Sequence, residues 1–245
     1  MEDVILGAWH GGLGDNLQLS SLPEQFYKQQ GRKTYIWADS KFRNDDIYKM
    51  VWFFNPYICG IKHGERNAGD TPDLNYHNIA GDHIANIEQL HGLKPVNKYP
   101  KLYYKPVSII GYGDAFLVDF SCISVTYPIE TLKRKLEEIK SEFPNKRFVE
   151  IVFSKNLNHG KRTHEYDMNL DEKVVVDGLF DYYDLIANSY GIVALSSGAS
   201  HMSSAIKEKD NSNLNSICIM EEYWYNKHMD TGKLFIYDNV RYEII

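Results

Sequence analysis

A glycine-rich turn that ends in a carboxylate is the first feature of the chain that could do chemistry. It reads Gly11-Gly12-Leu13-Gly14-Asp15 and follows a short apolar run, Val4-Ile5-Leu6. Glycines let a backbone approach a ligand closely, and the free N–H groups at a helix start attract anions. A carboxylate at this place can take a proton from a hydroxyl group. On this turn alone, a helix-capping role for Asp15 is the alternative, because aspartate is a favoured cap.

The spacing of this turn excludes two common nucleotide-binding motifs. Gly12 and Gly14 fit the dinucleotide fingerprint, but its third glycine position is occupied by Leu17. The P-loop is excluded because no Gly-Lys-Ser/Thr follows the turn. His10, Gly12 and Gly14 are therefore candidate contacts to a phosphate or to an acceptor, with a packing role for His10 as its alternative.

A second turn is rich in hydroxyl groups and follows a predicted buried strand, Gly191 to Leu195. Its small residues lead into a predicted helix, so several N–H groups and hydroxyls gather at a helix start. Such a start suits a diphosphate. The alternative is an ordinary serine cap with a histidine that packs or faces water. The candidate donor-binding residues are Ser196, Ser197, Gly198, Ala199, Ser200 and His201.

A third polar segment, Asn158 to His164, follows a predicted strand over 148–153. Lys161 and Arg162 in it are candidate phosphate contacts, with a solvated loop as the alternative. Its two histidines lack a third partner of metal-ligand spacing, so no zinc site is predicted. We expect no metal site elsewhere, since Asp45-Asp46 is interpreted as a solvated helix start.

The elements that must position these turns alternate between strands and helices. Residues 4–38 are predicted to form one strand–loop–helix–strand unit, whose helix carries Leu19, Leu22 and Phe26 and ends at Gly31. This alternation is the repeat of a parallel α/β sheet. A second series follows from residue 115, with strands over 115–120, 148–153, 173–176, 191–195, 217–219 and 234–236 and helices over 128–143, 181–189 and 200–207.

A lysine-rich, proline-punctuated stretch separates the two series. His91 to Tyr112 contains four lysines and three prolines and no acidic residue, which favours a linker or extended crossover. We therefore predict two Rossmann-like α/β halves, residues 1–105 and 106–245, with a cleft between them.

Composition excludes several classes of protein. The 245 residues carry a net charge of −6 and no long basic run, which argues against nucleic acid as a partner. The three cysteines are widely spaced and suggest neither a disulfide framework nor a zinc site. No stretch approaches the roughly 20 apolar residues of a membrane-spanning helix. The expectation is a cytoplasmic protein with at most peripheral contact with the inner membrane.

The two turns together resemble those of the heptosyltransferase-like glycosyltransferases, family 9, which have the GT-B fold. Members open with a strand, a Gly-Asp turn and a hydrophobic helix start, here Gly14 to Leu22. Near the end they carry a strand, then Asp-Ser/Thr-Gly-x-x-His and an alanine-rich helix. Ser196 to Ala205 is the corresponding stretch here, with Ser196 in place of the usual aspartate. The chain is also short for the fold, so its N-terminal half is expected to be trimmed.

This resemblance implies transfer of a hexosyl or heptosyl group from a nucleotide-sugar to a saccharide or glycolipid acceptor. The pathway implied is bacterial surface-glycan synthesis, of lipopolysaccharide or capsule. Asp15 takes the position of the general base in the acceptor-side N-terminal half, and the 196–201 turn takes the donor diphosphate in the C-terminal half. The nucleotide-sugar is a co-substrate, and neither a cofactor nor a metal is expected.

Two alternatives remain open on the sequence. One is a nucleotide-sugar epimerase or hydrolase of the same fold, which would need additional acids near the sugar. The other is a nucleotide-binding subunit without turnover, which the serine at position 196 and the short first half keep open.

Overall fold

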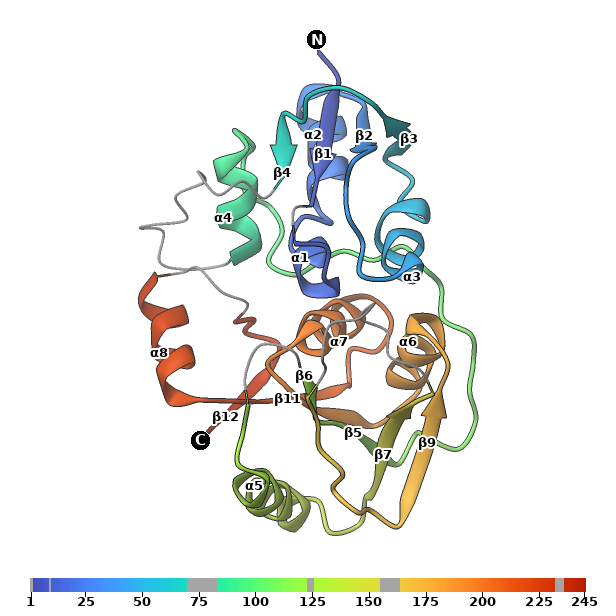
Figure 1. Cartoon of the computed structure of the whole chain (residues 1–245), viewed down its shortest axis with the longest axis vertical. Coiled ribbons are helices and arrows are strands. Elements are labelled where there is room, and N and C mark those ends of the chain that lie inside the picture. Colours follow the sequence, from blue (N-terminus) through green and yellow to red (C-terminus); the bar gives the residue numbers. More distant parts are fainter. Residues whose placement is uncertain (1, 9, 70–82, 123–125, 155–163, 232–235) are drawn as a thin grey trace. The chain divides into compact units, whose positions relative to one another are not determined.

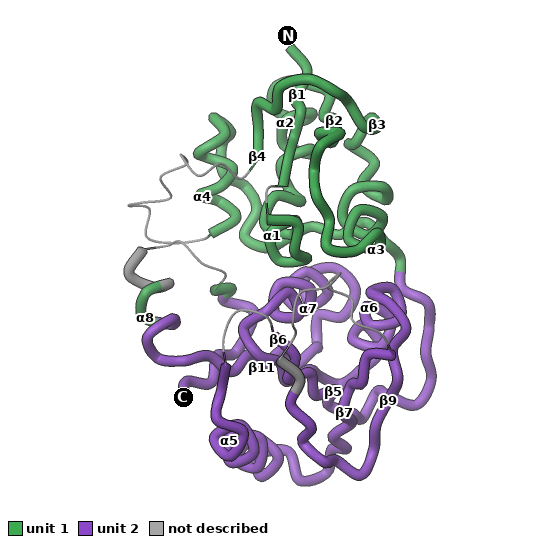
Figure 2. The backbone as a smooth tube through the Cα atoms, in the orientation of Figure 1, with its two compact units in different colours: residues 1–105, 226–237 green, residues 106–225, 238–245 purple. Residues whose placement is uncertain are grey.

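The computed structural model describes residues 2–8, 10–69, 83–122, 126–154, 164–231 and 236–245. The chain forms two compact units, coloured separately in Figure 2. The first comprises Met1–Lys105 and Asn226–Tyr237, and the second comprises Pro106–Tyr225 and Asp238–Ile245. The predicted division at residue 105 agrees with the main boundary between the units, but it assigned residues 226–237 to the second half, whereas they belong to the first unit.

The first unit is built on a four-stranded parallel sheet with the order β3-β2-β1-β4 (Figure 1). Its central pair, β1 and β2, comes from the predicted first strand–loop–helix–strand repeat. The outer strands are β3 and the two-residue β4. Their bounds are β1 Val4–Gly7, β2 Thr34–Trp37, β3 Ile58–Lys62 and β4 Ala68–Gly69.

The helix predicted after the first turn is split in two. A short helix, α1 (Leu13–Leu17), is followed by a turn and then by α2 (Leu22–Gln30). Pro23 stands near the start of α2, where a missing N–H costs no helical hydrogen bond. Gly31 ends α2 in the left-handed region, at φ 63°, as predicted.

Three further helical segments complete the first unit. Asn44 caps α3 (Asp45–Ile47) by accepting from the Ile47 N–H, and the chain continues directly into the π-helix η1 (Tyr48–Phe53). The interpretation of Asp45-Asp46 as a helix start is thereby confirmed. The helix α4 (His83–Leu90) follows later in the chain. The lysine-rich stretch from Leu93 to Gly111 contains no regular element, as expected of a linker.

The second unit carries a six-stranded parallel sheet with the order β12-β11-β10-β5-β7-β9 (Figure 1). Five of its strands fall on predicted segments: β5 (Ala115–Asp119), β7 (Arg147–Phe153), β9 (Glu172–Val176), β10 (Gly191–Leu195) and β11 (Asn215–Met220). The edge strand β12 (Arg241–Ile244) and the antiparallel pair of β6 (Ser121–Cys122) with β8 (His164–Glu165) are additions. The strand predicted at 234–236 lies mostly outside the described residues.

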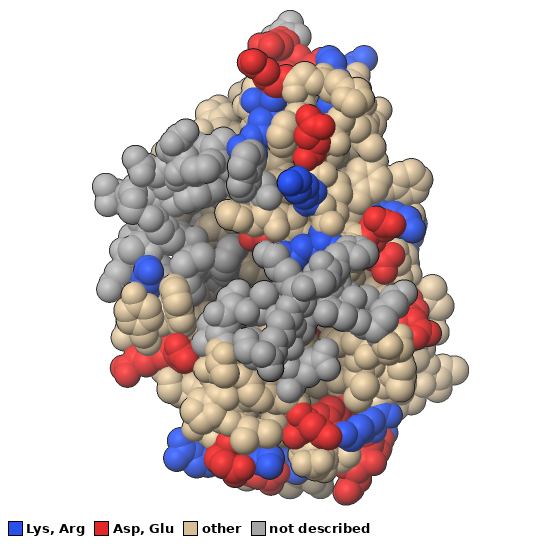
Figure 3. All heavy atoms as spheres, in the orientation of Figure 1, with Lys and Arg blue, Asp and Glu red and all other residues tan. Residues whose placement is uncertain are grey.

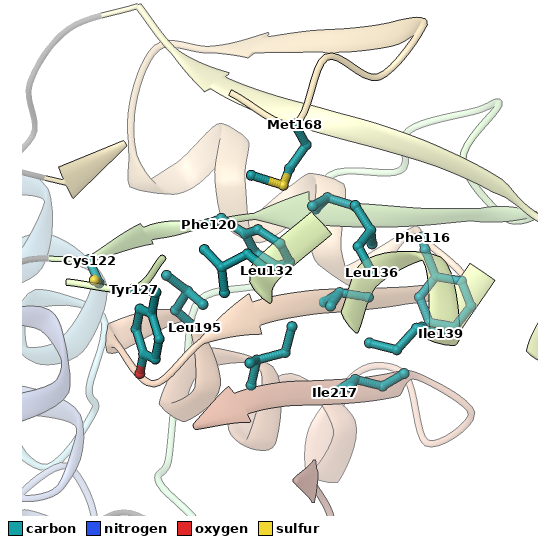
Figure 4. Close-up of a cluster of buried hydrophobic side chains, with 13 residues drawn as sticks. Phe116, Phe120, Cys122, Tyr127, Leu132, Leu136, Ile139, Met168, Leu195 and Ile217 are labelled. Carbon is teal, nitrogen blue, oxygen red and sulfur yellow. The ribbon is translucent and has the colours of Figure 1, made fainter. Parts of the chain in front are cut away.

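Helices of the second unit cover both faces of this sheet (Figure 1). On one face lies α5 (Ile129–Glu142), whose residues Leu132, Leu136 and Ile139 are buried, as the helical spacing predicted. They pack against alternate residues of the strands, including Phe116 and Ile217, in the cluster that Figure 4 shows. The other face carries α6 (Leu179–Ala187) and α7 (Gly198–Lys209), and α8 (Glu222–Thr231) follows β11.

Candidate functional site

The Gly-Asp turn leaves the carboxyl end of β1, the edge at which parallel α/β sheets place their ligands. Gly12 is the N-cap of α1, and Asp15 is its third residue. One carboxylate oxygen of Asp15, Oδ2, accepts a hydrogen bond from the Gly12 N–H at 2.9 Å. The side chain remains 24% exposed. Asp15 thus does cap its helix, and it also presents part of its carboxylate to solvent.

The glycines at positions 11 and 12 are required by close packing against the loop after β2. Gly11 has φ +68°, and a Cβ there would lie 2.2 Å from the carbonyl oxygen of Lys41. A Cβ at Gly12 would lie 2.6 Å from Asp15 Oδ2 and 3.1 Å from Nη1 of Arg43. Any larger residue would displace the carboxylate or the guanidinium, so the glycines position both groups.

Arg43 lies beside Asp15 and was not among the residues predicted from the sequence. Its Nη2 atom lies 4.0 Å from Asp15 Oδ2, and its backbone N–H donates to the Gly11 carbonyl at 2.9 Å. The pairing of the strands could have indicated Arg43. Because β1 and β2 are parallel neighbours, the segments that follow their carboxyl ends lie close together. Arg43 follows the predicted second strand by only a few residues.

Two buried hydrogen bonds through the Asn16 side chain support the turn. The Asn16 side chain donates to the Gly12 carbonyl at 2.7 Å and accepts from the indole N–H of Trp52 at 2.8 Å. Asn16 and Trp52 are both buried. Because leaving a buried polar group unpaired costs free energy, these two hydrogen bonds hold the turn in one conformation.

The other candidates of the first unit differ in their surroundings. His10 is exposed at the start of the turn, and Gly14 is half-buried within α1. A cavity of about 360 Å³ in this unit is lined by other residues, among them Phe26, Arg66 and His91. None of the predicted site residues that the structure describes is among its lining residues.

The serine turn leaves the carboxyl end of β10 and starts α7, as predicted. Ser197 is the N-cap, and its hydroxyl accepts from the Ala199 N–H at 3.2 Å. Ser196, Ser197 and Gly198 are half-buried, and the Ser196 N–H donates to the Ile219 carbonyl at 3.2 Å. The turn lies at a helix start, the kind of place where backbone N–H groups can meet an anion.

The remaining residues of this turn face inward. The Ser200 hydroxyl donates to the Ser197 carbonyl at 2.8 Å, and His201 is only 3% exposed. Further along α7, Ser203 shares a 2.6 Å hydrogen bond with Ser216 of β11. The hydroxyl-rich helix start is thus used largely to pack α7 on its sheet, and the accessible part of the turn is 196–198.

A buried carboxylate lies at the same edge of the second sheet and was not predicted as a site residue. Asp119 ends β5, opposite Ala194 of β10. It accepts from the N–H and hydroxyl of Ser121, at 2.9 and 2.6 Å, and from the Tyr182 hydroxyl at 2.6 Å. Burial raises the pKa of Asp119, against the effect of these donors. Asp119 holds α6 to the sheet edge beside the serine turn.

Neither a large area of one charge on the face shown in Figure 3 nor a group suited to a metal ion is found among the described residues. On the face shown in Figure 3, basic and acidic side chains are interspersed and form no large area of one sign. No group of three or more His, Cys, Asp or Glu residues within the described ranges could hold a metal ion. No helix among these residues is long and apolar enough to cross a membrane. Lys161 and Arg162 lie outside the described residues.

Each unit has a sheet of parallel strands flanked by helices, with a turn at the carboxyl end of a central strand. The fold is therefore two Rossmann-like halves of GT-B type. Among solved structures, the chain resembles the E. coli heptosyltransferase WaaC with ADP, at 11% identity and a TM-score of 0.56. That match covers 99% of this chain and 93% of WaaC. The expected similarity to heptosyltransferase structures is thereby confirmed at the level of the fold.

A second neighbour is TibC from enterotoxigenic E. coli H10407, described as an iron-containing dodecameric glycosyltransferase. Identity is 14% and the TM-score 0.58. The match covers 89% of this chain, which spans only 58% of TibC. TibC has also been solved with ADP-D-β-D-heptose, and that structure matches with a TM-score of 0.56. The described residues of this chain offer no cluster of ligands for iron.

Sequence comparisons add no closer relative. No protein-family model matches the chain, and a search of curated proteins gave no significant match. The similarity to solved structures therefore establishes the fold.

Proposed function

We propose that the protein is a glycosyltransferase that moves a sugar from a nucleotide-sugar to an acceptor hydroxyl. The observation that carries the proposal is the partly exposed carboxylate of Asp15 on the Gly-Asp turn of a GT-B-type fold. The neighbours WaaC and TibC, solved with ADP and with ADP-heptose, support a nucleoside diphosphate sugar as the donor. A bacterial surface glycan, in lipopolysaccharide or capsule, is the proposed product.

Asp15 is the proposed general base. Its Oδ2 atom is engaged by the Gly12 N–H, whereas no described residue hydrogen-bonds to Oδ1. In the reaction, Oδ1 takes the proton of the acceptor hydroxyl while that oxygen forms its bond to the anomeric carbon. The bond from the anomeric carbon to the diphosphate breaks, and the nucleoside diphosphate leaves with the bonding electrons.

The accessible part of the serine turn is the proposed site for the leaving diphosphate. The helix start offers backbone N–H groups and the positive end of a helix dipole to the developing negative charge. The inward-facing Ser200 and His201 support the turn rather than reach the donor. Lys161 and Arg162 remain candidate phosphate contacts.

Metal-independent catalysis is part of the proposal, because a helix start can replace a cation at the diphosphate. Activity is expected to survive EDTA. Loss of activity on chelation, restored by Mg²⁺ or Mn²⁺, would point to a metal-bound diphosphate. The reaction is placed in the cytoplasm, with at most peripheral contact between the protein and the membrane that carries a glycolipid acceptor.

The deciding experiment is a panel of nucleoside diphosphates and nucleotide-sugars, read by the melting midpoint of the full chain. A ligand at about 100 times its Kd adds about 2.7 kcal/mol to the stability of the native state. For a chain of this size that corresponds to a rise of roughly 5–11 °C. NAD is the control, because Leu17 replaces a glycine of its fingerprint.

Nucleotide release, measured with and without saccharide acceptors, then separates the alternatives. Acceptor-dependent release supports a transferase, and acceptor-independent consumption of the donor supports a hydrolase or epimerase. A shift of the melting midpoint without turnover on any acceptor supports a non-catalytic subunit. If NAD or a simple sugar shifts the midpoint and no nucleoside diphosphate does, the proposal is wrong.

A further inference from the structure

A row of aromatic side chains runs along the surface of the first unit and joins three segments that are far apart in the sequence. We call these six residues the aromatic row: Tyr27, Phe53, Phe54, Tyr57, Tyr103 and Tyr104. From Phe53 to Tyr27, the centres of neighbouring rings lie 5.5 to 6.1 Å apart, and Tyr103 and Tyr104 are adjacent in the chain. Rings at such separations are in contact, so the row is one continuous feature.

The aromatic row exposes large apolar side chains to solvent. Phe53 is 65% exposed, Tyr27 56% and Phe54 42%, whereas the preceding Trp52 is buried. The end of η1 thus places one aromatic residue in the core and the next two at the surface. A single exposed apolar side chain is ordinary, but a contiguous group of them marks an interaction surface.

Lysines belong to the same three segments, which are α2 and residues 49–57 and 101–105. They are Lys28, Lys49, Lys101 and Lys105. The only carboxylate of these segments is the buried Glu24, which pairs with Lys28 at 2.6 Å and with Lys101. Four lysines against one carboxylate give the segments a formal charge of +3, on a chain whose net charge is −6. The aromatic row therefore lies in a locally basic surface.

Hydrogen bonds hold the 101–105 segment to the start of α2. The Lys101 N–H donates to the Ser20 hydroxyl at 2.7 Å, and the Tyr103 hydroxyl donates to Glu24 at 3.1 Å. The ammonium group of Lys101 also donates to Glu24. The surface is therefore formed before any partner binds, which reduces the entropy cost of docking.

We propose that the aromatic row and its four lysines dock the protein on the headgroup region of an anionic lipid bilayer. Aromatic side chains are favoured at the membrane–water interface, and lysines are attracted to anionic headgroups. Protein interfaces, by contrast, are enriched in arginine and depleted in lysine. The three segments contain four lysines and no arginine, so the composition favours a bilayer over a protein partner.

The test measures co-sedimentation of the full chain with vesicles of phosphatidylcholine alone and of an equal mixture with phosphatidylglycerol. We expect binding to the anionic vesicles that weakens with added salt, and weaker binding to the neutral ones. Phe53→Ser combined with Phe54→Ser is expected to lower the partition coefficient roughly 10- to 100-fold for the anionic vesicles. Lys49→Gln combined with Lys105→Gln should lower it roughly 10- to 30-fold there and leave binding to neutral vesicles unchanged.

Matched controls lie in the second unit. Ile110→Ser with Val175→Ser removes two exposed apolar side chains, and Lys133→Gln with Lys140→Gln removes two cations of α5. Both control variants should bind vesicles like the unaltered chain, and the melting midpoint of every variant checks that it is folded.

The exposed Cys59 gives a second readout, because the other two cysteines are buried and Cys59 follows Tyr57 closely in the chain. A polarity-sensitive fluorophore on Cys59 should shift its emission to the blue with anionic vesicles. That shift should be lost in the Phe53→Ser, Phe54→Ser variant.

The proposal is overturned if anionic vesicles do not bind the chain, or if the aromatic or lysine variants bind them as well as the unaltered chain does. It is also overturned if the chain is a dimer by sedimentation velocity that Phe53→Ser with Phe54→Ser dissociates, since the surface would then join two copies.

The inference stands on this surface and does not depend on the transfer reaction, so the two can fail separately. Asp15→Asn should bind vesicles like the unaltered chain. If nucleotides do not bind but vesicle binding depends on the aromatic row, the glycosyltransferase proposal fails and the docking surface stands. If turnover occurs and vesicles do not bind, the docking surface fails.

Discussion

The two turns of the molecule have the same place in their sheets but different chemistry. In the first unit, the turn after β1 starts a helix of five residues and presents two formal charges, those of Asp15 and Arg43. In the second, the turn after β10 starts a helix of twelve residues whose hydroxyls are largely used inside the unit. The first turn thus carries charged side chains, whereas the second carries small and hydroxyl-bearing residues at the start of a longer helix.

The sharpest test of this difference is Asp15→Asn. The amide keeps the size of the carboxylate and can still accept from the Gly12 N–H, but it cannot take a proton. Turnover is expected to fall roughly 10²–10⁴-fold, with donor affinity almost unchanged. Steady-state nucleotide release measures the first and nucleotide titration the second.

The control for this variant is Asp45→Asn, which changes an exposed carboxylate in the same unit. It should leave turnover within about twofold, as is usual for a surface change. Near-normal turnover of Asp15→Asn would reduce Asp15 to the cap of its helix.

At the second turn, Gly198→Val is expected to weaken donor binding roughly tenfold or more, because the branched side chain blocks the approach of a diphosphate to the helix start. Nucleoside diphosphate affinity by titration is the measurement. Gly113→Val is the matched control, since a Cβ at this exposed glycine meets nothing within 4 Å. Equal donor affinities in the two variants would remove the diphosphate from this turn.

Tyr182→Phe tests the buried support of the second turn. It removes one donor from the buried Asp119 carboxylate and is expected to lower the free energy of unfolding by about 1–3 kcal/mol. Urea unfolding measures it, with Tyr223→Phe at an exposed site as the control. A loss no larger than that of the control would show that the hydroxyl is dispensable.

The smallest expected effect lies in the first unit, at His91, and it depends on pH. Its Nδ1–H donates to the Ile87 carbonyl at 2.8 Å, and Nε2 accepts from the Gly69 N–H at 3.1 Å. Burial lowers the pKa of His91, so the unfolded chain binds this proton more readily than the folded chain. The stability due to His91 is therefore present above about pH 6.5 and is lost as pH falls below it.

Denaturant unfolding at pH 7 and pH 5 measures this contribution. The loss of stability between these values should be smaller in His91→Gln than in the unaltered chain. The exposed His63 offers a control in the same unit, and His63→Gln should follow the unaltered chain. Parallel pH curves for His91→Gln and the unaltered chain would contradict the prediction.

The parts of the fold that could be predicted are those that the residue spacing within one short segment determines. The 3.6-residue spacing of Leu132, Leu136 and Ile139 determines the buried side of α5, and Gly31 ends α2 because it readily adopts a positive φ. The two-residue β4 and the π-helix η1 have no such pattern, since a few residues cannot establish a period. The edge strand β12, Arg-Tyr-Glu-Ile, is half polar and is specified by its pairing with β11.

The sequence predicted the two strand–turn–helix segments, but it did not indicate Arg43 and Asp119, which lie beside them. Asp15 and Ser197 were recognisable because each lies directly in a strand–turn–helix segment. Arg43 and Asp119 required the pairing of β1 with β2 and of β5 with β10, which no local pattern specifies. The inward orientation of His201 also depends on tertiary packing, since helical position alone does not determine which neighbour a side chain meets.

The close approach of Gly11 to the Lys41 carbonyl has a consequence for how this protein can diverge. A side chain at position 11 would require the loop at 39–43 to take another path, and that path would carry Arg43 away from Asp15. Single exchanges at positions 11 and 12 should therefore be rare among its evolutionary relatives. Lineages that lose these glycines are expected to change the loop after the second strand as well.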